Sequence, residues 1–134
     1  MPLVPEPSAA PAPAARVLLV DDEVSSAEVL ALILAGEGLH VTTAPDARQA
    51  LARLEQAAPD LLVTDFMMPG INGAQLVEQV RQVERYAQLP VLMMSGAPEV
   101  ALRPYNARYD AFLRKPFNLE QFLQTVHALL RPQR

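Results

Sequence analysis

The chain has 134 residues, of which 51% are hydrophobic and 19% charged, a composition that fits one globular domain with a substantial core. Cysteine is absent, which excludes disulfides and thiol chemistry, and the two histidines, His40 and His127, are too far apart in sequence to suggest a zinc site. The net charge is -4 and the sequence has no basic stripe, so we expect no direct binding to nucleic acid or to a membrane surface.

The first 15 residues are rich in proline and alanine and carry one charged side chain, Glu6. Proline fixes φ and removes a backbone donor, so residues 1–15 are predicted to form a disordered, extended tail, with a docking segment for a partner as the alternative. The domain itself is predicted over residues 16–134. No stretch resembles a membrane span or a signal peptide, and we expect a cytoplasmic protein.

Short apolar runs alternate with helical patterns along the rest of the chain. The predicted strands are residues 17–20, 39–43, 61–64, 91–94 and 111–113. The predicted helices are residues 24–34, 46–56 and 73–85, a short helix that starts at Pro98 and stops before Pro104, and a last helix capped by Asn118. The helical spacing places Val24 and Leu119 on the buried faces of the first and last helices. The alternation predicts a doubly wound α/β domain with a parallel five-stranded sheet.

Polar residues follow four of the five predicted strands, at the end of a parallel sheet where ligands bind. They are Asp21 and Asp22, Asp65, Ser95, and Lys115, the only lysine among 11 basic residues. Each has an ordinary explanation when taken alone: acidic residues cap helices, a Ser-Gly pair makes a turn, and a lysine adds solubility. Parallel strands would bring all of them into one crevice.

The residue types in this crevice suit phosphoryl transfer. Clustered carboxylates repel one another unless a cation joins them, and oxygen ligands favour Mg²⁺, with Mn²⁺ as the alternative ion. A carboxylate can attack phosphorus to give an aspartyl phosphate, while a lysine and a hydroxyl bind the phosphoryl oxygens.

Four segments closely resemble the receiver domain of bacterial two-component response regulators, of the stand-alone chemotaxis or sporulation-relay type. They are residues 17–23 (VLLVDDE), 62–73 (LVTDFMMPGING), 93–97 (MMSGA) and 114–117 (RKPF). The resemblance covers residues 16–131. It implies a flavodoxin-like (βα)5 fold with strand order 2-1-3-4-5.

The resemblance also implies a role for each site residue. Asp65 would accept a phosphoryl group from the phosphohistidine of a histidine kinase or a histidine phosphotransfer protein. Asp21 and Asp22 would hold Mg²⁺ together with Asp65 and the backbone carbonyl of Met67. Ser95 and Lys115 would bind the phosphoryl oxygens, and the bond between Lys115 and Pro116 would be cis.

Ser95 and Phe112 would form the switch. In this family the hydroxyl residue moves towards the phosphoryl group and an aromatic residue fills the vacated space, although Phe112 lacks the hydroxyl of the tyrosine often found there. The fourth helix, the fifth strand and the last helix would then present a changed face to a downstream protein. Pro104 departs from the family pattern and places the usual output face in doubt. Tyr105 and Tyr109 would form an exposed, partner-specific patch, with simple loop packing as the alternative.

The leading interpretation is a single-domain response regulator, because only residues 131–134 follow the last helix. We also expect a monomer or a weak homodimer. Its catalysis would be confined to self-phosphorylation and self-dephosphorylation. The alternative is a pseudo-receiver, a protein-binding module that works without phosphate. A phosphatase with an aspartate nucleophile is disfavoured, because such enzymes usually carry a second aspartate where this chain has Met67.

Overall fold

The computed structural model describes residues 13–131, so residues 1–12 of the predicted tail lie outside the described residues. Five parallel strands form one sheet in the order β2-β1-β3-β4-β5, as predicted. The strands are β1 (Arg16–Val20), β2 (His40–Ala44), β3 (Leu61–Asp65), β4 (Val91–Ser95) and β5 (Ala111–Arg114). All five predicted strands are therefore present, with shifts of one residue at some ends.

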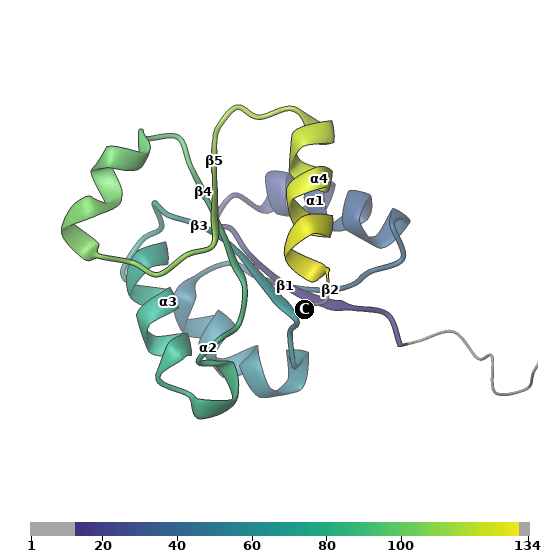
Figure 1. The fold of residues 1–134 in the computed structure, drawn as a ribbon, viewed down its shortest axis with the longest axis horizontal. Helices are drawn as coiled ribbons and strands as arrows, with labels where there is room; N and C mark the ends of the chain where they lie inside the picture. Colours follow the sequence, from purple (N-terminus) through teal and green to yellow (C-terminus); the bar gives the residue numbers. More distant parts are fainter. Residues whose placement is uncertain (1–12, 132–134) are drawn as a thin grey trace, which may run out of the picture.

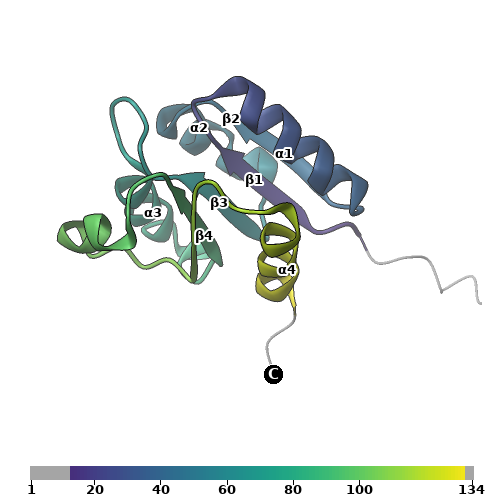
Figure 2. The same ribbon diagram turned by 90° about the horizontal axis from the view of Figure 1, so that it is seen from above.

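Helices cover both faces of the sheet, which confirms the flavodoxin-like fold (Figures 1 and 2). One face is covered by α1 (Val24–Gly36) and α4 (Leu119–Leu130), and the other by α2 (Ala47–Ala57) and α3 (Gly73–Arg81). Two 3-10 helices, η1 (Glu84–Tyr86) and η2 (Glu99–Tyr105), complete the connections. Each crossover leaves the carboxyl end of one strand and returns the chain to the amino edge of the sheet, so the carboxyl ends of all five strands gather at one edge.

The central strands bury side chains on both faces, which explains their unbroken apolar runs. Successive residues alternate between two core layers. Leu18 and Leu62 pack towards α2 and α3, whereas Leu19 and Val63 pack towards α1 and α4. Strand β3, which ends at Asp65, is buried along its whole length.

Polar side chains start three of the helices by accepting hydrogen bonds from free backbone N–H groups. The predicted caps Asp46 and Asn118 accept hydrogen bonds from the backbone N–H groups of Gln49 and Gln121, at 2.8 and 2.6 Å. Asn72 starts α3 in the same way and forms a reciprocal capping box with Gln75, which the sequence prediction did not include.

Two helix predictions need correction. The α-helix predicted over residues 73–85 ends at Arg81, and η1 follows after two residues of turn. The helix after Pro98 is η2, and it does not stop before Pro104 but contains it. The fixed φ of proline suits a 3-10 turn, so Pro104 fits near the end of η2 and removes only the one hydrogen bond that its N–H would have donated.

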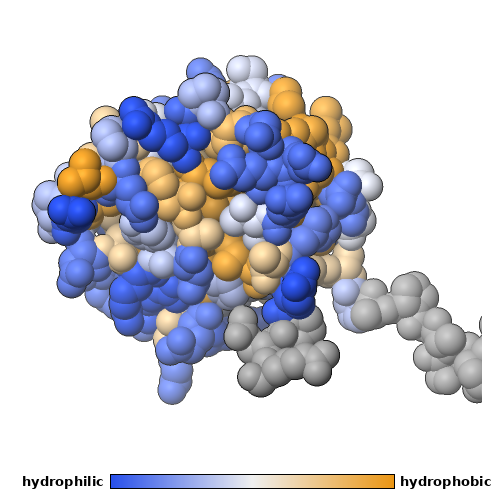
Figure 3. Space-filling model, turned by 45° about the horizontal axis from the view of Figure 1, so that its top comes forward, coloured by the Kyte–Doolittle hydropathy of each residue, from blue (hydrophilic) through white to orange (hydrophobic). Residues whose placement is uncertain are grey.

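The predicted inward positions of Val24 and Leu119 are also wrong, because their side chains are 62% and 46% exposed. Each is the first residue of its helix, at the end of the loop that enters it, so the packed part of each helix begins later. Along α1, Val29 and Leu32 are exposed as well, and hydrophobic side chains gather on that part of the surface (Figure 3). Within residues 13–131, no helix is long and apolar enough to cross a membrane.

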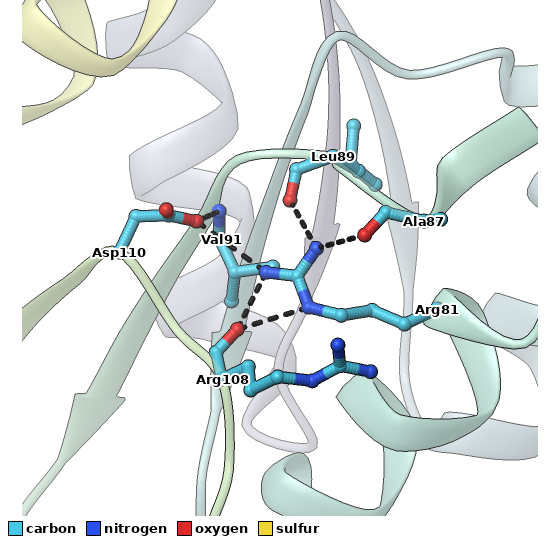
Figure 4. A network of polar contacts seen from close by, with 6 residues as sticks. All are labelled: Arg81, Ala87, Leu89, Val91, Arg108 and Asp110. Atoms are coloured by element: carbon cyan, nitrogen blue, oxygen red, sulfur yellow. Dashed lines mark hydrogen bonds and ion pairs between the residues drawn. The ribbon is translucent and has the colours of Figure 1, made fainter.

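One nearly buried arginine fastens the amino-terminal side of the sheet (Figure 4). The guanidinium of Arg81 donates to the carbonyl oxygens of Ala87, Leu89 and Arg108, and it lies 3.4 Å from Asp110. Asp110 also accepts a hydrogen bond from the backbone N–H of Val91, at 2.8 Å. Arg81 therefore joins the end of α3 to the segments that lead into β4 and β5.

Replacing Arg81 by alanine should lower the free energy of unfolding by about 1–3 kcal/mol, because the carbonyl oxygens around it lose a buried donor. Arg108→Ala is the matched control. It removes an exposed side chain that makes no hydrogen bond within residues 13–131 but keeps the Arg108 carbonyl, so a change within about 0.5 kcal/mol is expected. Urea unfolding followed by circular dichroism measures both. Equal losses in the two variants would contradict this role for Arg81.

Candidate functional site

The fold brings the predicted site residues to the carboxyl edge of the sheet. Asp21 directly follows β1, Asp65 and Ser95 are the last residues of β3 and β4, and Lys115 directly follows β5. Because β3 lies between β1 and β4, Asp65 takes the central place. Residues separated by nearly the length of the domain thus share one site.

Three carboxylates meet at this edge. Asp21, Asp22 and Asp65 each place an oxygen within 4.8 Å of the others, with Asp21 and Asp65 buried and Asp22 exposed. The Glu23 backbone N–H donates to Asp21 Oδ1 at 2.9 Å and fixes the orientation of that carboxylate. Its other oxygen, Oδ2, is buried without a hydrogen-bond partner among the described residues. A buried charged oxygen left in this way calls for a cation.

Lys115 provides positive charge inside this cluster. Its Nζ lies 3.3 Å from Asp65 Oδ1 and 3.6 Å from Asp21 Oδ2. One ammonium against three carboxylates leaves an excess of negative charge. The oxygen-only donor set and this excess of negative charge fit a hard divalent ion such as Mg²⁺ or Mn²⁺.

Burial raises the pKa of Asp65 above its ordinary value, and the nearby carboxylates of Asp21 and Asp22 push it in the same direction. Lys115 acts against this rise through its charge and through a hydrogen bond. Ionisation of Asp65 therefore destabilises the folded domain, and positive charge added at this edge of the sheet would reduce that destabilisation.

Ser95 is fully buried, and its Oγ accepts a hydrogen bond from the backbone N–H of Ala97 at 2.9 Å. The backbone N–H of Lys115 donates to the carbonyl oxygen of Ser95 at 2.8 Å, so a backbone hydrogen bond joins the two residues. Phe112 is half-buried, with its ring centroid 6.1 Å from that of Tyr109. Met67 follows Asp65 by two residues with an exposed side chain, and the Lys115–Pro116 bond is cis as predicted.

Gly73 is a supporting residue that the sequence prediction did not single out. Its backbone N–H donates to the carbonyl of Phe66 at 2.8 Å, so the start of α3 lies directly against the end of β3. A Cβ at this position would overlap the carbonyl oxygen of Asp65 and lie 3.0 Å from Met93 Sδ. A glycine eight residues after the central aspartate was the available signal, but its meaning depends on this tertiary approach.

An apolar groove adjoins the acidic cluster on the α1 side. It is lined by residues of α1 and of the loop after β5, including Val29, Lys115 and Phe117, and Asp21 contributes to its wall. Val29, which lines the groove, is also one of the exposed hydrophobic side chains of α1. The site is thus open to a macromolecule along one side.

The chain resembles known proteins in both sequence and structure. The profile of the response regulator receiver domain matches residues 17–127. Curated relatives include the DNA-binding dual master transcriptional regulator RpaA of Synechocystis, 32% identical over 87% of this chain and 49% of that protein. The transcriptional regulatory protein TrcR of Mycobacterium tuberculosis is 34% identical over 87% of this chain and 45% of that protein. The chain therefore spans about half the length of the curated relatives it matches.

Solved structures match over nearly their whole length. The chemotaxis protein CheY4 of Vibrio cholerae has a TM-score of 0.82 and 33% identity, over 87% of this chain and 99% of that chain. The response regulator protein TrrA of Thermotoga maritima, solved in complex with Mg²⁺ and beryllofluoride, has a TM-score of 0.77 and 27% identity, again over 87% and 99% of the two chains.

Gly73→Ala should lower the free energy of unfolding by about 1–3 kcal/mol, because the added methyl group forces α3 away from the end of β3. Gly36→Ala is the control, since a Cβ there meets no atom within 4 Å, and it should be neutral or stabilising by up to about 1 kcal/mol. Chemical unfolding of the two variants measures the difference. Similar effects at both positions would show that α3 does not approach Asp65 closely.

Asp65→Asn should raise the melting temperature of the metal-free protein at neutral pH. The pKa of Asp65 lies above its ordinary value of 3.8 in the folded state, so the folded chain holds the Asp65 proton more tightly than the unfolded chain. The destabilisation from its ionisation is therefore present at neutral pH and fades as the pH falls towards 3.8.

Thermal unfolding measured in the presence of a chelator, from neutral pH down towards 3.8, tests the prediction. The wild-type and Asp65→Asn curves should converge at acid pH, and Mg²⁺ should narrow the gap at neutral pH. A variant that melts below the wild type at neutral pH would contradict the electrostatic account.

Proposed function

The chain belongs to the response regulator receiver domain family, and from this premise we propose that it is a phosphorylation switch whose acceptor is Asp65. The observation that carries the proposal is the central carboxylate of Asp65, which lies between two further aspartates and a lysine ammonium 3.3 Å away. This arrangement suits a reaction that requires positioning and neutralisation of charge more than acid–base groups.

In the proposed reaction a carboxylate oxygen of Asp65 attacks the phosphorus of a phosphohistidine. The bond between phosphorus and the imidazole nitrogen of the donor breaks, and its electron pair returns to that nitrogen. Mg²⁺, or Mn²⁺ as the alternative, held by Asp21, Asp22, Asp65 and the Met67 carbonyl, would neutralise phosphoryl charge when bound. Lys115 binds a phosphoryl oxygen in place of its present contact with Asp65. Catalysis by this chain is limited to its own phosphorylation and dephosphorylation.

A histidine kinase or a histidine phosphotransfer protein is the proposed donor. The donor histidine must reach Asp65, so the surface around that histidine must cover the rim of the site. The groove beside Asp21 and Lys115 and the exposed Val29 of α1 offer an apolar contact area in that place. Lys115 lines this area and lies 3.3 Å from Asp65, and this proximity supports a protein as the donor.

Phosphorylation is proposed to act on the rest of the domain through Ser95. The added group brings nearly two negative charges and new acceptor oxygens, which attract the Ser95 hydroxyl away from the Ala97 N–H. Phe112, half-buried on the neighbouring strand, then takes up the space that Ser95 leaves. The face formed by η2, β5 and α4 changes shape, and a downstream protein that prefers this shape shifts the population.

Output through protein contact is proposed for this domain, rather than contact of the domain itself with DNA. RpaA, which is named as DNA-binding, is about twice as long as the region that it shares with this chain, and the net charge of -4 on this chain does not favour contact with DNA. The likeness to CheY4 over 99% of that chain supports the proposal of a stand-alone receiver. We further propose that the protein is monomeric or weakly dimeric and located in the cytoplasm.

Acetyl phosphate and Mg²⁺ should add one phosphoryl group to the wild type, measured as a shift in intact mass. Asp65→Asn should show no shift, and a chelator should prevent the shift in the wild type. Asp60→Asn is the matched control, because Asp60 lies at the opposite edge of the sheet and accepts its hydrogen bond from the Arg16 N–H. A wild type without any shift would contradict the proposal and favour a pseudo-receiver that works without phosphate.

A further inference from the structure

We propose that the hydrogen bond between Tyr109 and Glu99 is a latch that holds η2 while Asp65 is unphosphorylated, and that phosphorylation opens it. The proposal rests on the function proposed for Asp65, and it assigns a role to residues outside the acidic cluster. It concerns how η2 is released, a step for which the fold offers a specific geometry.

Segment η2 is weakly held by its own structure. It is a seven-residue 3-10 helix that contains Pro104, and 3-10 hydrogen bonds are too poorly aligned for such lengths to be common. Leu102 is its only fully buried side chain, while Val100 and Tyr105 are exposed. Contacts made from outside the helix must therefore decide where it lies.

Tyr109 makes such a contact with the first residue of η2. Its hydroxyl donates to Glu99 Oε2 at 2.6 Å, a short bond of the charge-assisted kind. Burial raises the pKa of Tyr109 to about 12, and the bond to the Glu99 carboxylate contributes to the rise. Tyr109 is half-buried beside Phe112 and not part of the fully exposed patch that the sequence suggested.

The two partners differ in how firmly they are fixed. The neighbours of Tyr109 in the chain, Arg108 and Asp110, are both bound by the guanidinium of Arg81 (Figure 4). Asp110 also pairs with Val91 at the start of β4. Tyr109 is consequently the fixed part of the latch, and Glu99 is the part that can leave.

Glu99 is tied to the site by a short stretch of chain. Ser95 lies four residues before it, and the turn between them is closed by the bond from the Ala97 N–H to Ser95 Oγ. When the Ser95 hydroxyl turns to a phosphoryl oxygen, this N–H loses its acceptor and the turn must move. That movement draws the start of η2 away from Tyr109.

The far end of η2 has its own contact with the site. The ring of Tyr105 meets that of Phe66 edge-on, with centroids 5.4 Å apart at 72°, and Phe66 directly follows Asp65. The backbone N–H of Phe66 also donates to the carbonyl oxygen of Met94, the residue that precedes Ser95. Tyr105 therefore keeps the end of η2 in place while Glu99 leaves, so opening is a swing of the segment rather than its detachment.

Opening of the latch would widen a hollow that is already present beside η2. The hollow has a volume of about 410 Å³ and lies between η2 and Tyr109, with Glu99, Leu102 and Ala107 in its wall. Removal of the bond that closes it exposes apolar surface from Leu102 outward. The latch thus links the state of Asp65 to the surface of η2.

Hydrogen–deuterium exchange of residues 99–107, with beryllofluoride and Mg²⁺ as the phosphoryl mimic, tests the latch on the whole chain. Tyr109→Phe removes the hydrogen bond and keeps the ring, and it should speed exchange without beryllofluoride by about three- to ten-fold, the effect of one side-chain hydrogen bond. Because opening of the latch and binding of beryllofluoride are coupled in this proposal, the beryllofluoride concentration at half-saturation should fall by a similar factor in Tyr109→Phe. Glu99→Ala should behave alike, and the double variant should add nothing further.

Tyr105→Phe is the matched control, because its hydroxyl makes no hydrogen bond within residues 13–131, and both quantities should stay within about two-fold of the wild type. Unchanged exchange in Tyr109→Phe would overturn the latch, and faster exchange with an unchanged half-saturation would overturn its coupling to Asp65. A wild type that does not respond to beryllofluoride would contradict the proposed function instead, and the exchange comparison would still decide whether Tyr109 holds η2.

Discussion

The repulsion among Asp21, Asp22 and Asp65 is the constraint on which the rest of the structure depends. The parallel sheet forces the ends of β1 and β3 together, so these carboxylates cannot separate without loss of the fold. Lys115, brought in from β5, offsets only part of the excess charge and leaves one oxygen of Asp21 without a hydrogen bond. The fold thereby keeps an edge that gains stability from added positive charge, which a divalent cation would supply.

The domain combines firmly held and weakly held segments around the carboxyl edge of the sheet. Gly73 sets α3 directly against the end of β3, and Arg81 fastens the segments that enter β4 and β5. These contacts fix the backbone that carries Asp65 and Lys115, so the site keeps its geometry. In contrast, η2 is held by contacts at its two ends, where Glu99 meets Tyr109 and Tyr105 meets Phe66. A fixed site beside a weakly held segment is the arrangement that a switch requires.

The sequence predicted those features that depend on local pattern and topology. Unbroken apolar runs indicated the buried strands, and the expected parallel sheet brought Asp21, Asp65 and Lys115 to one edge. The strand order came from the resemblance to receiver domains. The features that it missed depend on distant partners. Nothing near Arg81 in sequence indicates that Arg108 and Asp110 lie within its reach, and Tyr109 meets Glu99 only because η2 folds back. Val24 and Leu119 fit the helical spacing, yet each stands at the first residue of its helix, where packing has not begun.

Titration of the wild type with Mg²⁺, followed by the backbone amide NMR signals of residues around Asp21 and Asp65, tests the electrostatic account most directly. The account predicts saturable binding of one ion with an affinity of roughly sub-millimolar to millimolar strength. Binding should be lost in Asp22→Ala and kept in Asp46→Asn, which changes a helix cap outside the carboxylate cluster. Binding that persists unchanged in Asp22→Ala, or a wild type whose signals do not move, would contradict it.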